Sequence, residues 1–162
     1  MTVTVQEIDI FETPATVPII HQCNCHGVMG KGLAKKIRAR YPEAYAEDLL
    51  VHAKRCRGGV DPSKLGTFST AVCLGGDLRR IYNMYGQLHF YGPGPKTNYD
   101  AVDKALRAIA EHAISLQCEL LAIPYQMGCG YGGGTWHVVR SIINSIFTKD
   151  GMPDILICRH GV

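Results

Sequence analysis

Two glycine-rich segments of the sequence have the composition of anion-binding loops. Residues 24–32 read NCHGVMGKG and residues 127–134 read MGCGYGGG, and each follows a short apolar run and precedes a helical pattern. Glycine carries no Cβ, so backbone N–H groups can approach an anion closely, and the N-terminus of the following helix adds partial positive charge. A tight turn explains either loop alone equally well. Two such loops after strands, however, predict a diphosphate held between them.

Neither segment matches the standard phosphate motifs of nucleotide enzymes. Lys31 is followed by Gly32 rather than by Ser or Thr, which argues against a nucleoside triphosphatase. The G-x-G-x-x-G pattern is missing from the first segment, and its near match in the second comes too late in the chain for a Rossmann start. Cys23, Cys25 and His26 invite a metal interpretation, but the C-x-C spacing lacks the second ligand pair of zinc fingers. We therefore expect no metal and no organic cofactor.

Hydrophobic patterns predict the strands that position these segments. They are expected over residues 3–10, 17–20, 66–72, 79–85, 119–124 and 154–158. The pair 66–72 and 79–85, joined through Gly75, Gly76 and Asp77, is compatible with antiparallel pairing or with mere proximity. Residues 55–62 and 88–97 are rich in Gly and Pro and are predicted to be loops.

Helices are predicted between these strands. One runs from Gly32 to Tyr41, and Pro42 ends it and lets the next helix begin. A long amphipathic helix is expected over residues 99–116, and a last one after an N-cap at Thr135. Strands alternating with helices predict an α/β fold with a largely parallel sheet covered on both faces, as one domain over residues 1–162.

The composition limits the environment and the partners. Hydrophobic residues make up 46% of the chain and the mean hydropathy is 0.00, with no apolar stretch long enough for a membrane span. Seven cysteines, an odd number, and an N-terminus without a secretory pattern favour free thiols in the cytoplasm. A net charge of +3 does not indicate nucleic-acid binding. We expect a small-molecule ligand and favour a monomer, although the sequence leaves the oligomeric state open.

Three motifs resemble those of macrodomains, a family that binds ADP-ribose. Residues 21–34, which read HQCNCHGVMGKGLA and are followed by RYP at 40–42, resemble the first ligand loop and helix of that family. Residues 8–10 (IDI) resemble its early Gly-Asp-Ile signature, and residues 123–136 resemble its second phosphate loop. The resemblance covers nearly the whole chain. It implies a three-layer α/β/α macrodomain with a mixed, largely parallel central sheet.

The resemblance also implies roles for individual residues. Asp9 would accept a hydrogen bond from the adenine amino group with Ile10 beside the ring, and Asn24 would contact the distal ribose. The diphosphate would lie between Gly30, Gly32 and Leu33 on one side and Met127, Gly128, Cys129, Gly130, Tyr131 and Gly132 on the other. The catalytic residues would be Asn24, His26 and His21, with His26 or His21 donating a proton. His21 follows an apolar strand, a position that suits a core histidine equally well.

Within the family, the chain looks closest to ADP-ribose 1''-phosphate phosphatases and to antitoxin-type ADP-ribosyl glycohydrolases. The glycohydrolases have a Thr-Lys pair where this chain has Gly86 and Gln87, and an acidic residue near the tryptophan where this chain has residues 132–135, GGGT. Gln cannot carry the charge of Lys, and without the carboxylate a general base is missing. The sequence therefore favours a hydrolase that removes phosphate from ADP-ribose 1''-phosphate. A non-catalytic ADP-ribose-binding module and an ADP-ribosyl hydrolase acting on macromolecules are the alternatives.

Overall fold

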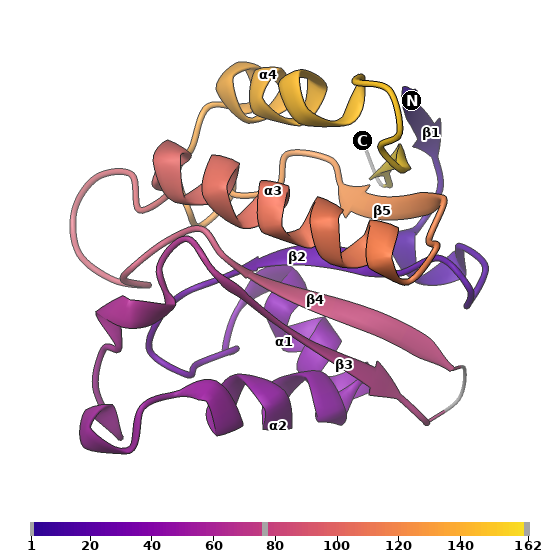
Figure 1. Ribbon diagram of the computed structural model, residues 1–162. Helices are drawn as coiled ribbons and strands as arrows, with labels where there is room; N and C mark the ends of the chain where they lie inside the picture. The colour runs from indigo at the N-terminus through magenta and orange to yellow at the C-terminus, as the bar shows by residue number, and fades with distance from the viewer. Residues whose placement is uncertain (1, 76–77, 161–162) are drawn as a thin grey trace.

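A six-stranded sheet forms the centre of the protein, for which a computed structural model describes residues 2–75 and 78–160 (Figure 1). Its strands are β1 (Val3–Glu7), β2 (Ile19–Cys23), β3 (Phe68–Cys73), β4 (Arg79–Tyr85), β5 (Leu120–Pro124) and β6 (Asp154–Arg159). The spatial order is β1-β6-β5-β2-β4-β3. All neighbouring strands are parallel except β3 and β4, which pair antiparallel. The mixed, largely parallel sheet is therefore confirmed, and the pairing that the sequence left open is antiparallel. Gly76 and Asp77 of the connecting turn lie outside the described residues.

Helices cover both faces of the sheet (Figure 1). They are α1 (Gly32–Arg40), α2 (Pro42–Val51), α3 (Tyr99–Ser115) and α4 (Trp136–Phe147). Adjacent residues of β2 divide between the two faces, since Ile19 packs in the cluster that includes α1 and α2 and Ile20 in the cluster that includes α3 and α4. Both side chains are fully buried, as expected for parallel strands between two helical layers. Within the described residues, no helix is both long and apolar enough to span a bilayer.

The helix boundaries follow local signals in the sequence. Pro42 occupies the first turn of α2, where its missing N–H costs nothing, and Asn98 Oδ1 caps α3 by accepting from Ala101 N at 3.0 Å. Thr135 occupies the N-cap of α4 as predicted, but its side chain makes no capping bond. Its backbone N–H donates instead to Tyr99 Oη at 2.9 Å, so the end of the second glycine loop is tied to α3.

Two predicted strands have different bounds from those expected. β1 ends at Glu7 rather than at Ile10, because Asp9 Oδ1 accepts from Phe11 N and caps a short 3-10 turn over Ile10–Glu12. β2 begins at Ile19 and continues to Cys23, so the polar residues after the apolar run belong to the strand and pair with β4. The predicted loop over residues 55–62 contains the end of another 3-10 turn, Lys54–Cys56, and the first residue of the next, Pro62–Lys64.

Candidate functional site

A cleft of about 440 Å³ opens at the carboxyl ends of β2 and β5, between the two glycine-rich loops. We call residues 24–32 loop 1, residues 127–134 loop 2, and this cavity the main cleft. The main cleft is lined by His21, Gln22, Cys23, Asn24, Val28, Gly30, Lys31, Gly32, Leu33, Ala34, Gln87, Phe90, Pro124, Tyr125, Gln126, Met127, Gly128, Gly130, Tyr131 and Gly132. Loop 1 follows β2 and leads into α1, whereas loop 2 lies between β5 and α4. Ligands of parallel α/β sheets bind at this edge.

Loop 1 is held in shape by the side chain of Asn24. Its Nδ2 donates to Val28 O at 2.8 Å, and its Oδ1 accepts from His26 N at 2.9 Å. Gly32 has a φ of +58°, and a Cβ there would lie 3.3 Å from the ring of Tyr131. Asn24 therefore both lines the main cleft and closes a turn, while glycine at position 32 lets α1 begin directly beneath loop 2.

Loop 2 is folded back on itself and fastened to the segment before α3. Gly134 N donates to Gly128 O at 2.8 Å, and Thr97 Oγ1 donates to the same oxygen at 2.6 Å. The backbone N–H of Thr97 donates to Gly132 O at 2.9 Å. A Cβ on Gly132 would lie 2.6 Å from both Gly128 O and Thr97 Oγ1, so only glycine fits this close approach.

A polar network that the sequence did not predict forms the floor of the main cleft. Gln22 Nε2 donates to Gln87 Oε1 at 2.8 Å and to Thr97 Oγ1 at 2.9 Å, while Gln87 Nε2 donates to His89 O at 2.8 Å. Gln22 Oε1 is buried and none of the described groups donates to it. Gln22 lies inside the motif at residues 21–34, which is the one sequence signal that pointed to it. Thr97 lies 75 positions away and carries no local signal.

The rim and the charge of the main cleft favour an anionic ligand. Lys31 Nζ of loop 1 lies 5.5 Å from the ring centroid of Tyr131 of loop 2, so the two loops meet across the opening. Tyr131 is 70% exposed. No Asp or Glu is found among the described residues that line the cleft, and Lys31 is the one Lys or Arg among them. Backbone N–H groups and a single ammonium group therefore act without opposing carboxylates.

The structure brings most of the predicted ligand-binding residues together. Asn24, Gly30, Gly32, Leu33, Met127, Gly128, Gly130, Tyr131 and Gly132 all line the main cleft. Cys129 does not, because its Sγ turns back to donate to Met127 O at 3.4 Å.

Asp9 and Ile10 also lie outside the lining of the main cleft. Asp9 caps the 3-10 turn after β1 and keeps a side chain that is 33% exposed. Ile10 is buried in the cluster that contains Leu33 of α1. Through that packing, the 3-10 turn after β1 reaches the helix that opens from loop 1.

His21 is a core residue of β2, although it is among the residues that line the main cleft. Its side chain is 1% exposed, and Nε2 lies 2.8 Å from Asn83 Oδ1. Asn83 Nδ2 donates to Ala44 O, so Oδ1 is an acceptor and His21 Nε2 carries the hydrogen. Burial lowers the pKa of His21, against the opposing effects of Asn83 and Asp48. This geometry favours the structural interpretation of His21 over the catalytic one.

His26 points away from the main cleft into a neighbouring cavity. Its Nε2 lies 2.9 Å from His89 Nδ1, and its ring packs edge-on against Phe90. Burial lowers the pKa of His26, and the nearby His89 and His52 lower it further. The structure therefore does not place His26 beside Asn24 as a proton donor in the main cleft.

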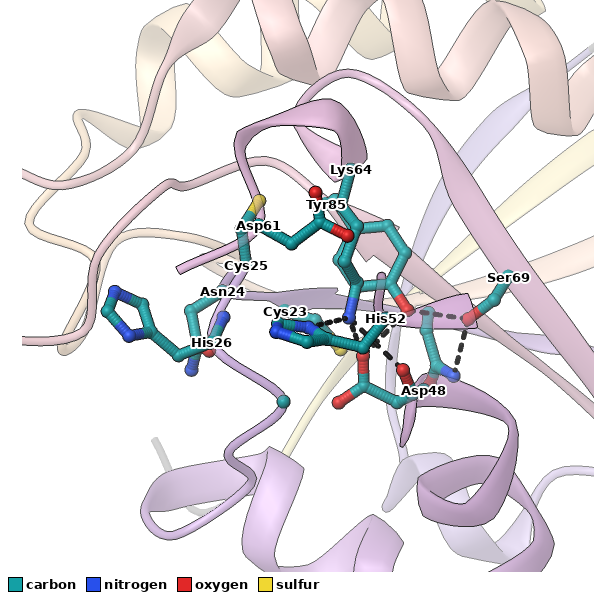
Figure 2. Close-up of polar contacts among 12 residues, drawn as sticks. Cys23, Asn24, Cys25, His26, Asp48, His52, Asp61, Lys64, Ser69 and Tyr85 are labelled. Carbon is teal, nitrogen blue, oxygen red and sulfur yellow. Dashed lines mark hydrogen bonds and ion pairs between the residues drawn. The ribbon is translucent and has the colours of Figure 1, made fainter. Parts of the chain in front are cut away.

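A buried polar cluster supports loop 1 from behind (Figure 2). Lys64 Nζ lies 2.6 Å from Asp48 Oδ1, which also accepts from Tyr85 Oη at 2.7 Å. Asp48 and Lys64 are 1% and 3% exposed. His52 Nε2 faces the carbonyl oxygens of Cys56 and Gly59, so it carries the hydrogen and Nδ1 can accept from Lys64 at 3.3 Å. The sequence does not predict this cluster, because lysine and aspartate residues are ordinarily exposed at the surface.

The cysteines of the C-x-C pair point to different neighbours. Cys25 Sγ donates to Gln87 O at 3.4 Å, and burial raises the pKa of this thiol to about 12. Cys23 Sγ lies 3.5 Å from His21 Nε2, and burial raises its pKa as well. Both thiols are therefore protonated at neutral pH. The ring of His26 points away from Cys23 and Cys25 (Figure 2).

Comparison with known proteins defines the family. Residues 20–143 match the family model described as Macro domain, so the chain belongs to the macrodomain family. A DNA ADP-ribosyl glycohydrolase of Mycobacterium tuberculosis is 31% identical over 142 residues, which cover 86% of this chain. The chain spans 37% of the length of that relative.

Two further similarities differ in extent. An ADP-ribose 1''-phosphate phosphatase of Neosartorya fischeri is 46% identical, but over 44 residues that cover 27% of this chain and 22% of the phosphatase. The macrodomain of Mycobacterium tuberculosis DarG superposes with a TM-score of 0.78 at 25% identity, covering 99% of this chain and 98% of that one. The fold predicted from the sequence, a three-layer macrodomain, is confirmed.

Proposed function

We propose that the main cleft binds ADP-ribose, with the diphosphate between loop 1 and loop 2. The carboxylate-free lining supports this proposal, since a diphosphate then meets backbone N–H groups and Lys31 without electrostatic repulsion. Asn24 contacts the distal ribose at the end of the cleft nearest β2. The adenine extends beyond the main cleft to Asp9, whose partly exposed carboxylate accepts from the amino group, with Ile10 beside the ring.

We further propose that the reaction is release of phosphate from ADP-ribose 1''-phosphate. Water attacks phosphorus, the bond between phosphorus and the 1''-oxygen breaks, and that oxygen leaves as the hydroxyl of ADP-ribose after protonation by water. The observation that carries this choice is again the absence of carboxylates among the described lining residues, because the extra phosphate brings about two more negative charges. The protein contributes by positioning the substrate and by neutralising charge with loop N–H groups.

A glycohydrolase is the second candidate, because the DNA ADP-ribosyl glycohydrolase is similar over 86% of this chain and the phosphatase over 27%. Gln87 argues against a glycohydrolase. Its amide is engaged by Gln22 and by the carbonyl of His89, and it cannot supply the charge of a lysine.

The test is a turnover assay with three substrates in parallel. Purified protein is incubated with ADP-ribose 1''-phosphate, with ADP-ribosylated single-stranded DNA and with ADP-ribosylated protein, and released phosphate and ADP-ribose are quantified. We expect phosphate alone, with Asn24→Ala lowering kcat more than it raises KM and with His26→Ala retaining activity. Release of ADP-ribose from DNA without release of phosphate would replace the phosphatase by the glycohydrolase. If none of the three substrates is turned over but ADP-ribose still binds, the protein is a non-catalytic binding module. Gln87→Lys, which places a lysine where the glycohydrolases have one, serves as the comparison variant.

A further inference from the structure

A second cleft of about 720 Å³ adjoins the main cleft and has no part in the proposed reaction. Its lining includes His26, Val28, Arg57, Phe90 and Tyr91. Val28 and Phe90 line both cavities, so these two side chains form the wall between them. Loop 1, the end of α2, the turn over residues 57–60 and the segment after β4 supply the remaining walls.

Aromatic rings crowd one side of this second cleft and remain open to solvent. The ring centroids of His26 and Phe90 are 5.0 Å apart, those of Phe90 and Tyr91 are 5.1 Å apart, and both pairs meet nearly perpendicularly. Phe90 is 42% exposed and Tyr91 is 58% exposed. Two adjacent, exposed aromatic residues held by edge-to-face contacts offer flat apolar faces, which are the usual platform for a planar ligand ring.

The lining of the second cleft also carries a cationic side chain. Arg57 is exposed in its lining, and the turn that leads to it carries the exposed residues Lys54 and Arg55. No Asp or Glu lines the cleft among the described residues. The nearest acidic group in sequence, Asp61, is fully buried and is engaged by the N–H groups of Ala53 and Ser63. An anionic group in the second cleft therefore meets Arg57 and no carboxylate among the described lining residues.

We propose that the second cleft binds a nucleotide unit, with its base stacked on Tyr91 and its edge against Phe90, and with its phosphate at Arg57. A nucleotide combines a planar ring with an anion, the two groups that the aromatic residues and Arg57 of this lining would bind, and stacking on aromatic rings accepts any base. The inference does not depend on the proposed reaction, because none of the residues that would hold the nucleotide is required to hold a diphosphate in the main cleft. The nucleotide can come free or as part of a single strand, and the two sources share the same chemistry.

The experiment is calorimetry on the protein with one equivalent of ADP-ribose bound in the main cleft, so that no excess of this adenine nucleotide competes for the second cleft. The probes are uridine 5'-monophosphate, a short single-stranded oligonucleotide, and inorganic polyphosphate as a probe of charge alone. The variants are Tyr91→Ala, Tyr91→Phe and Arg57→Ala, and Arg107→Ala on α3 is the matched control for loss of an exposed arginine, since Arg107 is 47% exposed and lies in neither cleft. ADP-ribose binding by each variant reports that the fold is intact.

We expect the mononucleotide or the oligonucleotide to bind the protein that carries ADP-ribose. Tyr91→Ala and Arg57→Ala should weaken that binding about fivefold or more, whereas Tyr91→Phe and Arg107→Ala should not change it. Tighter binding of the oligonucleotide than of the mononucleotide identifies a strand as the source, and equal binding identifies the free nucleotide. The proposal is overturned if neither probe binds, if Tyr91→Ala binds as well as the wild type, or if polyphosphate binds as tightly as both nucleotide probes.

Discussion

Thr97 Oγ1 donates a hydrogen bond of 2.6 Å to the carbonyl oxygen of Gly128, and it accepts one of 2.9 Å from Gln22 Nε2. One hydroxyl group thus joins β2, the segment before α3 and loop 2. These three pieces of chain are distant in sequence, and their relative position sets the width of the main cleft.

Removal of that hydroxyl should loosen loop 2. In Thr97→Val, Gly128 O and Gln22 Nε2 both lose a partner while the side-chain volume is kept, so we expect the free energy of unfolding to fall by about 1–3 kcal/mol. Affinity for ADP-ribose should fall with it. Thr97→Ser keeps the hydroxyl and is the control. Denaturant unfolding of both variants checks this, and a Thr97→Val protein as stable as the wild type would show that the bond contributes nothing.

Glycine should be required at position 132 of loop 2 and dispensable at position 130. A Cβ at Gly132 would meet two oxygen atoms at 2.6 Å, so Gly132→Ala should lower the free energy of unfolding by about 1–3 kcal/mol. A Cβ at Gly130 has nothing within 4 Å, and Gly130→Ala should stay within about 0.5 kcal/mol of the wild type. Thermal unfolding of the two proteins distinguishes them. Equal stability would mean that loop 2 relaxes freely.

The buried pair Asp48 and Lys64 should contribute far more to stability than the exposed pair Asp103 and Arg107. Asp48→Asn leaves a buried ammonium group without its counter-ion, which costs about 3–5 kcal/mol. Asp103→Asn affects side chains that are 37% and 47% exposed, so solvent screens the pair and the loss should be far smaller. The double variant Asp48→Leu with Lys64→Met removes both charges and should recover much of the loss. Urea titrations test this, and similar losses for Asp48→Asn and Asp103→Asn would contradict it.

His21 should make stability decline as the pH falls. Burial lowers its folded-state pKa below the unfolded value of about 6.5, so in the range beneath about pH 6.5 the unfolded chain takes up a proton that the folded protein does not. Stability is therefore complete above that range and decreases on acidification, until the folded state is protonated too. His21→Gln should reduce the slope by up to about 1.4 kcal/mol per pH unit relative to the exposed-site control His137→Gln. The free energy of unfolding is measured between pH 7 and 5 for the wild type and for His21→Gln. Equal slopes for the two proteins would reject this assignment.

The sequence was sufficient to predict the fold because local residue patterns mark where most helices and strands begin and end. Pro42 and Asn98 mark helix starts, and the apolar strands lie between two helical layers. The predicted end of β1 was wrong because the capping hydrogen bond of Asp9 competes with the sheet. An apolar pattern does not reveal such a bond.

The candidate site was predictable where it consists of contiguous loop residues. Its floor was not, because Gln22, Gln87 and Thr97 meet through tertiary contacts alone. The same limit applies to His26. It follows Asn24 by two positions in loop 1, yet its ring lies in the neighbouring cavity beside His89.

Calorimetric titration with ADP-ribose, AMP and NAD tests the central claim most directly. If loop 1 and loop 2 together hold a diphosphate beside a free distal ribose, ADP-ribose should bind at least about tenfold more tightly than AMP or NAD, a difference of about 1.4 kcal/mol. Gly132→Ala, which disturbs loop 2, should remove most of that preference. Equal affinity for AMP and ADP-ribose would contradict the two-loop account of the main cleft.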